Sequence, residues 1–252
     1  MENIRIIPRL DIKGTNVVKG IFTEGLRVVG NPKELAFKYY KDGADELLCM
    51  DIVASLYQRN FDFDLLRSVS EEIFIPITVG GGIRSVNDIN NALRAGADKV
   101  AINTYGIKKP KFLNEAVKKF GSQCIVLSVE AKHRNDGTWE AYTDGGREHT
   151  GINAVEWIRK ALVLGVGEVV ITSIDRDGSR KGYDTELISE VSKFCKVPLV
   201  VHGGAGTKES VVKVIKKTKI DAVAIATSFH YGDFKIKNLK EYLFKKKINV
   251  RV

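Results

Sequence analysis

The sequence predicts a (β/α)8 barrel, the TIM-barrel architecture, in which two half-barrels repeat one another. Eight short apolar runs alternate with amphipathic helical patterns over 252 residues, which is the element order and length of such a barrel. Two of the runs end in paired glycines, Gly80-Gly81 and Gly203-Gly204. The segment 100–102 recurs at 223–225 with the same separation as the two glycine pairs. One common separation indicates two similar halves in register, which a doubly wound sheet does not explain as well.

The expected strands are short runs rich in β-branched residues, a pattern typical of buried parallel strands. They comprise residues 5–11, 46–51, 77–79, 99–103, 124–130, 169–173, 199–202 and 222–226. Several of the intervening helical patterns begin with a capping Asn, Ser, Asp or Thr and end near glycine. The expected helices comprise residues 32–42, 63–72, 86–95, 110–120, 154–164, 185–194 and 208–217. We therefore expect residues 1–252 to form a single barrel domain.

Composition narrows the classes of partner. The formal net charge is +9, but the lysines are scattered and no segment interleaves them with aromatic residues. We therefore expect no nucleic-acid partner, whereas a basic surface attracts small phosphorylated anions. The N-terminus lacks the features of a signal peptide, and no apolar run approaches about 18 residues, so we expect no membrane segment.

Cysteine and histidine usage predicts the compartment and the metal content. An odd number of cysteines, far apart and inside apolar runs, indicates buried free thiols and a cytoplasmic location: Cys49, Cys124 and Cys195. The histidines lack the spacing of zinc ligands: His133, His149, His202 and His230. We expect neither a metal nor a cofactor.

The ends of the expected strands predict the chemistry, because barrel enzymes place their sites there. Glycine turns after strands allow backbone N–H groups to hold phosphate, so the two turns suggest two phosphates. Asp11 and Glu130 end the first and fifth strands, which stand opposite each other across a barrel of eight. Such a pair suits proton transfer, although loop capping or pairing with lysines explains the spacing equally well. Lys19 follows Asp11 on an expected loop and could reach a phosphate or a carboxylate.

Four charged residues stand at the opposite ends of the strands. They are Arg5, Glu46, Lys99 and Glu168. Their alternating signs favour a structural ring of ion pairs at the bottom of the barrel.

With these features in place, the chain resembles the cyclase subunit of imidazole glycerol phosphate synthase over nearly its whole length. The resemblance rests on the segments 5–8, 10–11, 17–20, 43–47, 78–84, 96–99, 120–123, 173–178, 182–184 and 203–206. It implies a (β/α)8 barrel of histidine biosynthesis that works as a heterodimer. In the family, a separate glutaminase subunit supplies ammonia at the bottom of the barrel. The ammonia crosses the interior and attacks a bisphosphorylated ribulosyl nucleotide at the top.

The resemblance also implies roles for individual residues. Arg5, Glu46, Lys99 and Glu168 would form the gate through which ammonia enters. The phosphate and substrate contacts carry over to Lys19, Gly82, Asn103, Thr104, Thr172, Asp177, Gly178, Gly204, Ala226 and Thr227. Two aspartates perform the acid and base chemistry in the family. Asp11 matches the first, and Glu130 stands in the place of the second.

Three positions depart from the family pattern. Glu130 replaces an aspartate, Arg9 stands where cysteine is usual, and His202 stands where serine usually precedes the glycines. A carboxylate displaced by about 1 Å can cost a catalyst on the order of 100-fold. Strict alternation places Arg9 on the inward face of its strand with Asp11. We expect Arg9 to pair with Glu130 and thereby to lower the pKa of Glu130.

These departures keep two alternatives to the cyclase open. The first is a paralogue in surface polysaccharide biosynthesis that passes ammonia to a sugar or nucleotide-sugar to make an acetamidino group. The second is a catalytically weak barrel that docks and activates a glutaminase. Turnover with ammonium salt separates both enzymes from the docking barrel.

Overall fold

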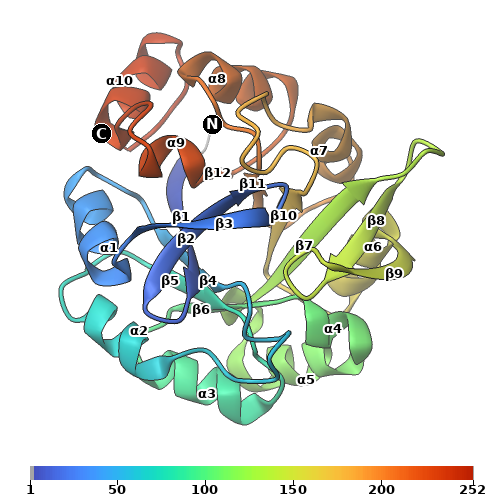
Figure 1. Ribbon diagram of the computed structural model, residues 1–252. Coiled ribbons are helices and arrows are strands. Elements are labelled where there is room, and N and C mark those ends of the chain that lie inside the picture. The colour runs from blue at the N-terminus through green and yellow to red at the C-terminus, as the bar shows by residue number, and fades with distance from the viewer. Residues whose placement is uncertain (1–2, 252) are drawn as a thin grey trace.

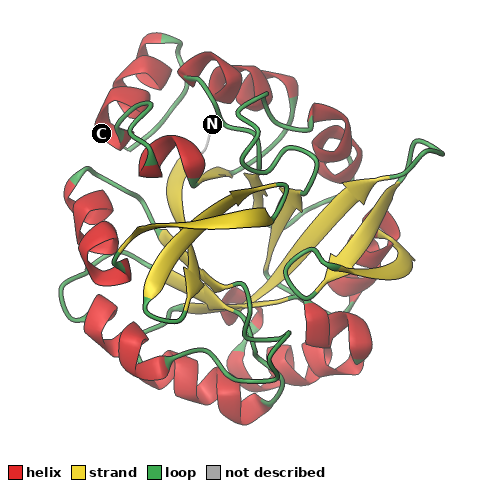
Figure 2. Cartoon of the chain, in the orientation of Figure 1, coloured by secondary structure: helices red, strands yellow, loops and turns green. Residues whose placement is uncertain are grey.

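Eight parallel strands close into a barrel in this computed structural model, which describes residues 3–251. The sheet runs in the order β10-β11-β12-β1-β4-β5-β6-β7, and pairing of β10 with β7 closes it. The barrel strands are β1 (Arg5–Lys13), β4 (Leu47–Asp51), β5 (Ile77–Gly80), β6 (Lys99–Ile102), β7 (Ile125–His133), β10 (Glu168–Ser173), β11 (Leu199–His202) and β12 (Ala222–Ile225). Figures 1 and 2 show them at the centre of a ring of helices. The predicted (β/α)8 barrel is confirmed.

Helices cover the outside of the barrel. They are α1 (Pro32–Lys41), α2 (Phe63–Ser70), α3 (Val86–Arg94), α4 (Thr104–Lys108), α5 (Lys111–Phe120), α6 (Ala154–Val163), α7 (Thr185–Ser192), α8 (Lys208–Lys217), α9 (Thr227–His230) and α10 (Ile236–Lys245), with a 3-10 turn η1 (Ser122–Cys124). Ser85 before α3 and Thr207 before α8 each form a capping box with the third residue of their helix. These two helices follow the two glycine turns, so the caps repeat between the halves.

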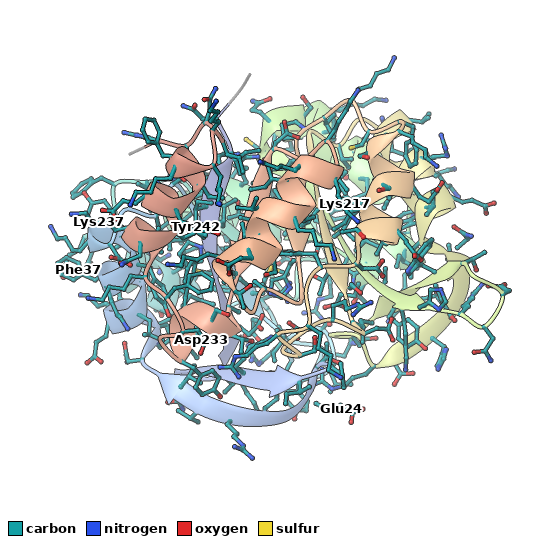
Figure 3. All side chains as sticks on the ribbon, turned by 90° about the horizontal axis from the view of Figure 1, so that it is seen from above. Glu24, Phe37, Lys217, Asp233, Lys237 and Tyr242 are labelled. Atoms are coloured by element: carbon teal, nitrogen blue, oxygen red, sulfur yellow. The ribbon has the colours of Figure 1, made fainter. Side chains whose placement is uncertain are left out.

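Two antiparallel extensions rise from the barrel. β1 continues into β2 (Asn16–Ile21), which pairs with β3 (Glu24–Gly30), and β7 continues into β8 (Trp139–Thr143) and β9 (Glu148–Asn153). Figure 3 shows the β2–β3 hairpin, marked by Glu24, at one end of the barrel. The loop expected around Lys19 is therefore wrong, because Lys19 lies within β2. Neither hairpin was expected from the sequence, nor were α4, α9 and α10.

The core has two layers. A large cluster packs between the sheet and the helices, and a smaller one fills the barrel interior. The interior cluster comprises Ile7, Leu48, Met50, Ala101, Val126, Val170, Val200, Ala222 and Ala224. Because both faces of each barrel strand are buried, the strands read as continuous apolar runs. On β12 the inward side chains Ala222 and Ala224 are small, as Ala101 is on β6.

Two further expectations concern the cysteines and membranes. All three cysteines are free; Cys49 is buried, as expected, but Cys124 and Cys195 are only partly buried. Among residues 3–251, no helix has the length and apolar character needed to cross a membrane.

Candidate active site

The first glycine turn shapes one side of the barrel top. Gly81 and Gly82 follow β5 with φ values of 107° and 71°, a region that favours glycine. A Cβ atom on Gly82 would lie 2.2 Å from the carbonyl oxygen of Arg59, so no other residue fits. Both glycines line a cavity of about 160 Å³ together with Asn103, Thr104 and residues of the facing strands.

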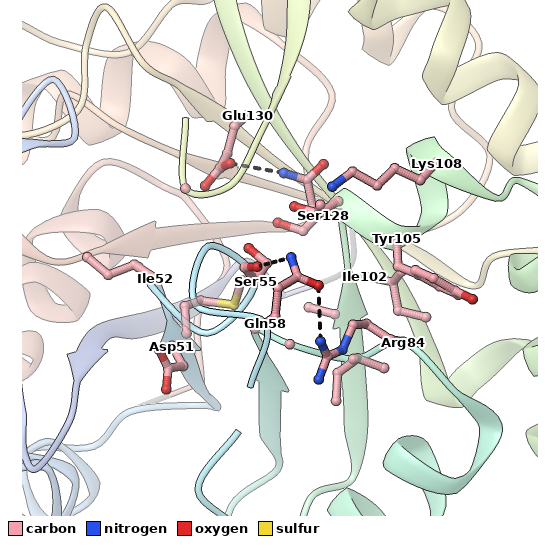
Figure 4. A pocket seen from close by; sticks show the side chains of 18 residues that line it. Asp51, Ile52, Ser55, Gln58, Arg84, Ile102, Tyr105, Lys108, Ser128 and Glu130 are labelled. Carbon is pink, nitrogen blue, oxygen red and sulfur yellow. Dashed lines mark hydrogen bonds between the residues drawn. The ribbon is translucent and has the colours of Figure 1, made fainter. Parts of the chain in front are cut away.

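Charged side chains surround this first cavity. Figure 4 shows Glu130 from β7, Lys108 from α4 and Arg84 from the turn before α3 reaching it from different sides. The Arg84 guanidinium donates to Gln58 at 3.3 Å and to Asn60 at 2.8 Å, which fixes its position. Lys108 and Arg84 were not singled out from the sequence. Arg84 belongs to the glycine-turn motif 78–84, which was the signal that could have identified it.

The second glycine turn shapes the opposite side. Gly203 and Gly204 follow β11 with φ values of 100° and 102°. A Cβ atom on Gly204 would lie 2.2 Å from the Gly182 carbonyl oxygen. A narrow cleft there is lined by Asp177, Gly178, His202, Gly204, Ala226 and Thr227, among others. A cavity of about 510 Å³ adjoins it and is lined by Lys19, Gly178, Arg180, Thr227 and Tyr231, among others. The structure thus brings the residues predicted for the second phosphate together.

Asp11 lies buried between two cations. Arg9 Nε donates to Asp11 Oδ1 at 2.7 Å, and Lys19 Nζ donates to Asp11 Oδ2 at 3.0 Å. Burial alone would raise the pKa of Asp11, but the charges of Arg9 and Lys19 outweigh burial and hold that pKa below its usual range. Lys19 also contacts both oxygens of Asp177, at 2.8 and 2.7 Å. Burial would lower the pKa of Lys19, but Asp11 and Asp177 raise it, so the cation is retained.

Glu130 has a different environment from Asp11. Its Oε2 accepts from Asn103 Nδ2 at 2.9 Å, and the carboxyl group also accepts from the Gly146 backbone N–H. No cation contacts it within hydrogen-bond distance in the described chain. Burial raises the pKa of Glu130 to about 7; Arg9 opposes that shift and Asp11 reinforces it. Glu130 is therefore the carboxyl group at this site that can gain and lose a proton near neutral pH.

The expected pairing of Arg9 with Glu130 is wrong. Arg9 points inward as expected, but its guanidinium contacts Asp11, Thr172 Oγ1 at 2.8 Å and His202 Nδ1 at 3.3 Å. Asp11 lies two residues along on the same face of β1, so it is the nearer partner. The expected lowering of the Glu130 pKa is wrong for the same reason, since burial prevails where no direct ion pair forms.

Asn103 and Thr104 occupy the first cavity with their side chains already engaged. Asn103 Nδ2 donates to Glu130 and to the Tyr142 carbonyl oxygen, and Thr104 Oγ1 accepts from the Asp144 backbone N–H at 3.0 Å. Asn103 Nδ2 has no further proton to donate, so contact of Asn103 with phosphate falls to its backbone, whereas the Thr104 hydroxyl can still donate. Both contacts remain predictions. Asn103 also has a second function that the sequence did not indicate, because it orients Glu130.

The four charged residues at the other end of the barrel form a closed ring. Arg5 Nη1 contacts Glu46 at 2.6 Å and Glu168 at 3.4 Å, and Lys99 Nζ contacts the same two carboxylates at 2.9 and 2.8 Å. Each cation thus bridges both anions. The ring closes the bottom of the apolar interior, as the alternating signs predicted.

Comparisons with known proteins agree with this arrangement. A family model described as "Histidine biosynthesis protein" matches residues 5–235. A protein of Legionella pneumophila named imidazole glycerol phosphate synthase subunit HisF is 54% identical over 209 residues, which cover 83% of this chain and 99% of that protein. Proteins of the same name from Dehalococcoides mccartyi and Lachnoclostridium phytofermentans are 46% and 47% identical, covering 100% of this chain and 99% and 98% of theirs. The chain therefore belongs to the histidine biosynthesis protein family.

Proposed function

We propose that this chain is the cyclase subunit of an imidazole glycerol phosphate synthase in histidine biosynthesis. It uses ammonia to convert a bisphosphorylated ribulosyl aminoimidazole carboxamide nucleotide to imidazole glycerol phosphate and AICAR. The observation that carries the proposal is the pairing of two glycine-lined clefts with Asp11 and Glu130 on opposite strands between them. A substrate held at both ends by phosphate would place its reacting centre beside these carboxylates.

The bottom of the barrel is the proposed entrance for ammonia. The ring of Arg5, Glu46, Lys99 and Glu168 covers one end of the apolar interior, and the carboxylate site lies at the other end. Neutral ammonia crosses an apolar interior more readily than ammonium, because burying an unpaired charge is costly. A glutaminase subunit docked at this end would supply the ammonia. The free cysteines fit the proposed cytoplasmic location.

Similarity to HisF subunits along the whole chain favours the cyclase over the sugar-modifying paralogue and over a barrel that only docks a glutaminase. The substrate contacts proposed are those of the two clefts, with Gly82, Asn103 and Thr104 in one and Gly178, Gly204, Ala226 and Thr227 in the other. Lys19 contacts Asp11, Asp177 contacts Lys19, and Thr172 accepts from Arg9. Their proposed part is to support the reacting centre.

Turnover of the bisphosphorylated nucleotide with excess ammonium salt tests the function directly. Glu130→Gln is expected to lower the rate by on the order of 100-fold or more, because it removes a proton-transferring group. Glu156→Gln, on the outer helix α6, is the control and should keep the wild-type rate. Wild-type protein that binds the nucleotide but does not convert it would contradict the proposal.

A further inference from the structure

Five polar side chains form a buried cluster within the proposed site. They are Arg9, Asp11, Lys19, Asp177 and His202, and each is at most 4% exposed. Two cations and two carboxylates balance one another. Burial, together with the charges of Arg9 and Lys19, lowers the pKa of His202 well below its ordinary value, so the imidazole is neutral. The cluster therefore carries no net charge.

The hydrogen bonds of this cluster fix the histidine tautomer. Arginine is only a donor, so His202 Nδ1 must accept from Arg9 Nη1, and the imidazole proton lies on Nε2. Nε2 faces Asp177 Oδ1 at 3.7 Å. His202 thus links Arg9 to Asp177, the carboxylate that also binds Lys19. The two departures at positions 9 and 202 are therefore joined in one network.

The two opposed carboxylates, Asp11 and Glu130, have different hydrogen-bond partners. Both oxygens of Asp11 accept from cations, Arg9 on one side and Lys19 on the other. Glu130 accepts only from uncharged donors, the Asn103 side-chain amide and the Gly146 backbone N–H. The charged groups near it are Arg9 and Asp11 from β1 and Arg147 from the turn after β8. A carboxylate with both oxygens in buried ion pairs gives up two charge-assisted bonds if it takes a proton.

We propose that Arg9 is a positioning residue that holds Asp11 as a fixed carboxylate, so that Glu130 alone exchanges protons during the reaction. The proposal rests on the cyclase function. Asp11 then stabilises positive charge that develops on the entering nitrogen. When the nitrogen lone pair forms the new bond to the ribulosyl carbonyl carbon, the π bond of that carbonyl breaks and its electron pair passes to the oxygen. Glu130 takes the proton that the nitrogen then loses and gives the same proton to this oxygen. One carboxyl group thereby carries out both transfers.

Infrared difference spectroscopy of the ligand-free protein tests the division of roles without any turnover. The wild type is expected to show one protonated-carboxyl band that disappears with a midpoint near pH 7. Glu130→Gln should abolish the band, whereas Asp11→Asn should keep it and move its midpoint to lower pH, because a charge that favours the protonated form is gone. A band that survives Glu130→Gln and vanishes in Asp11→Asn would overturn the inference.

Variants of Arg9 test the positioning role. Arg9→Met should add a second titrating carboxyl, that of Asp11, and a second ionisation in the pH profile of kcat. Arg9→Lys, which keeps a cation, should restore the single wild-type ionisation. A purely structural role would lower the rate of Arg9→Met equally at every pH, and that result would overturn the inference. Absent turnover of the nucleotide, with the infrared bands as expected, would count against the cyclase function alone.

Discussion

Replacing Arg9 by Met and Asp11 by Asn, singly and together, should reveal a strong coupling between these two residues. Both side chains are buried and joined by an Nε–Oδ1 contact of 2.7 Å. Removing one partner of a buried ion pair costs about 3–5 kcal/mol, since it leaves the other charge uncompensated. Here Lys19 still contacts Asp11, and Thr172 still contacts Arg9, so the lower end of that range, about 3 kcal/mol, applies to each single variant.

The double variant removes both charges together and leaves Lys19 paired with Asp177. It should therefore be destabilised by about 3 kcal/mol rather than by the sum of the two single effects, a coupling energy of about 3 kcal/mol. Urea unfolding followed by circular dichroism measures these free energies. In thermal melts each single variant should unfold roughly 6–12 °C lower than the wild type, because 1 kcal/mol shifts Tm by about 2–4 °C at this chain length.

A surface ion pair provides a matched control for this double-mutant cycle of Arg9 and Asp11. Arg180 Nε contacts Asp233 Oδ2 at the same distance, 2.7 Å, but this pair is 41% and 29% exposed. The cycle of Arg180→Met and Asp233→Asn should give a coupling of about 0–1 kcal/mol, as exposed ion pairs do. If the buried pair gave no larger coupling than this control, the reasoning about Arg9 would be refuted.

Three further outcomes are expected. The pKa of Glu130 is raised from 4.5 to about 7 in the folded state, so the protonated carboxyl group adds roughly 3 kcal/mol to the free energy of unfolding below about pH 4.5, and this contribution is lost as pH rises through 7. Urea unfolding of the wild type should therefore show this loss between about pH 5 and 8. Glu130→Gln should show no such loss. Gly204→Ala should prevent either stable folding or substrate binding, and calorimetry measures both. Gly137 has a similar φ of 80° but no atom within 4 Å of the new Cβ, so Gly137→Ala should lower the free energy of unfolding by only about 1–2 kcal/mol. Lys99→Met leaves Glu46 and Glu168 with Arg5 alone, and it should change the ratio of glutamine-dependent to ammonium-dependent turnover at least several-fold; an unchanged ratio would argue against a gate.

Most of the barrel could be predicted, because each barrel strand is buried on both faces and each covering helix has one apolar face. The expected strand at 199–202 and the expected helix at 208–217 have the observed bounds. The β2–β3 hairpin escaped prediction because β3 is largely exposed and carries no apolar periodicity. α10 has an apolar face of Ile236, Leu239 and Leu243, so the signal for this helix was present in the sequence although the prediction stopped at the strand before it.

The candidate site was likewise predicted only in part from the sequence. Strand ends predicted where Asp11 and Glu130 lie, since alternation and parallel pairing determine which residues point inward at the top. They did not predict the partner of Arg9, because a long side chain can reach several acceptors and its choice depends on the space left by strands distant in sequence. Asn103 Nδ2 donates both to Glu130 and to the Tyr142 carbonyl oxygen on β8, which pairs with Glu130, and the sequence did not predict β8.

The small inward side chains of β12 lie between two strands that exchange a polar contact. Ala224 lies in register with Ile7 on β1 and with His202 on β11. Arg9 Nη1 of β1 nevertheless contacts His202 Nδ1 of β11 at 3.3 Å, across the strand that separates them. We therefore expect positions 9 and 224 to be interdependent, so that a larger residue at position 224 is tolerated better when position 9 carries a smaller one.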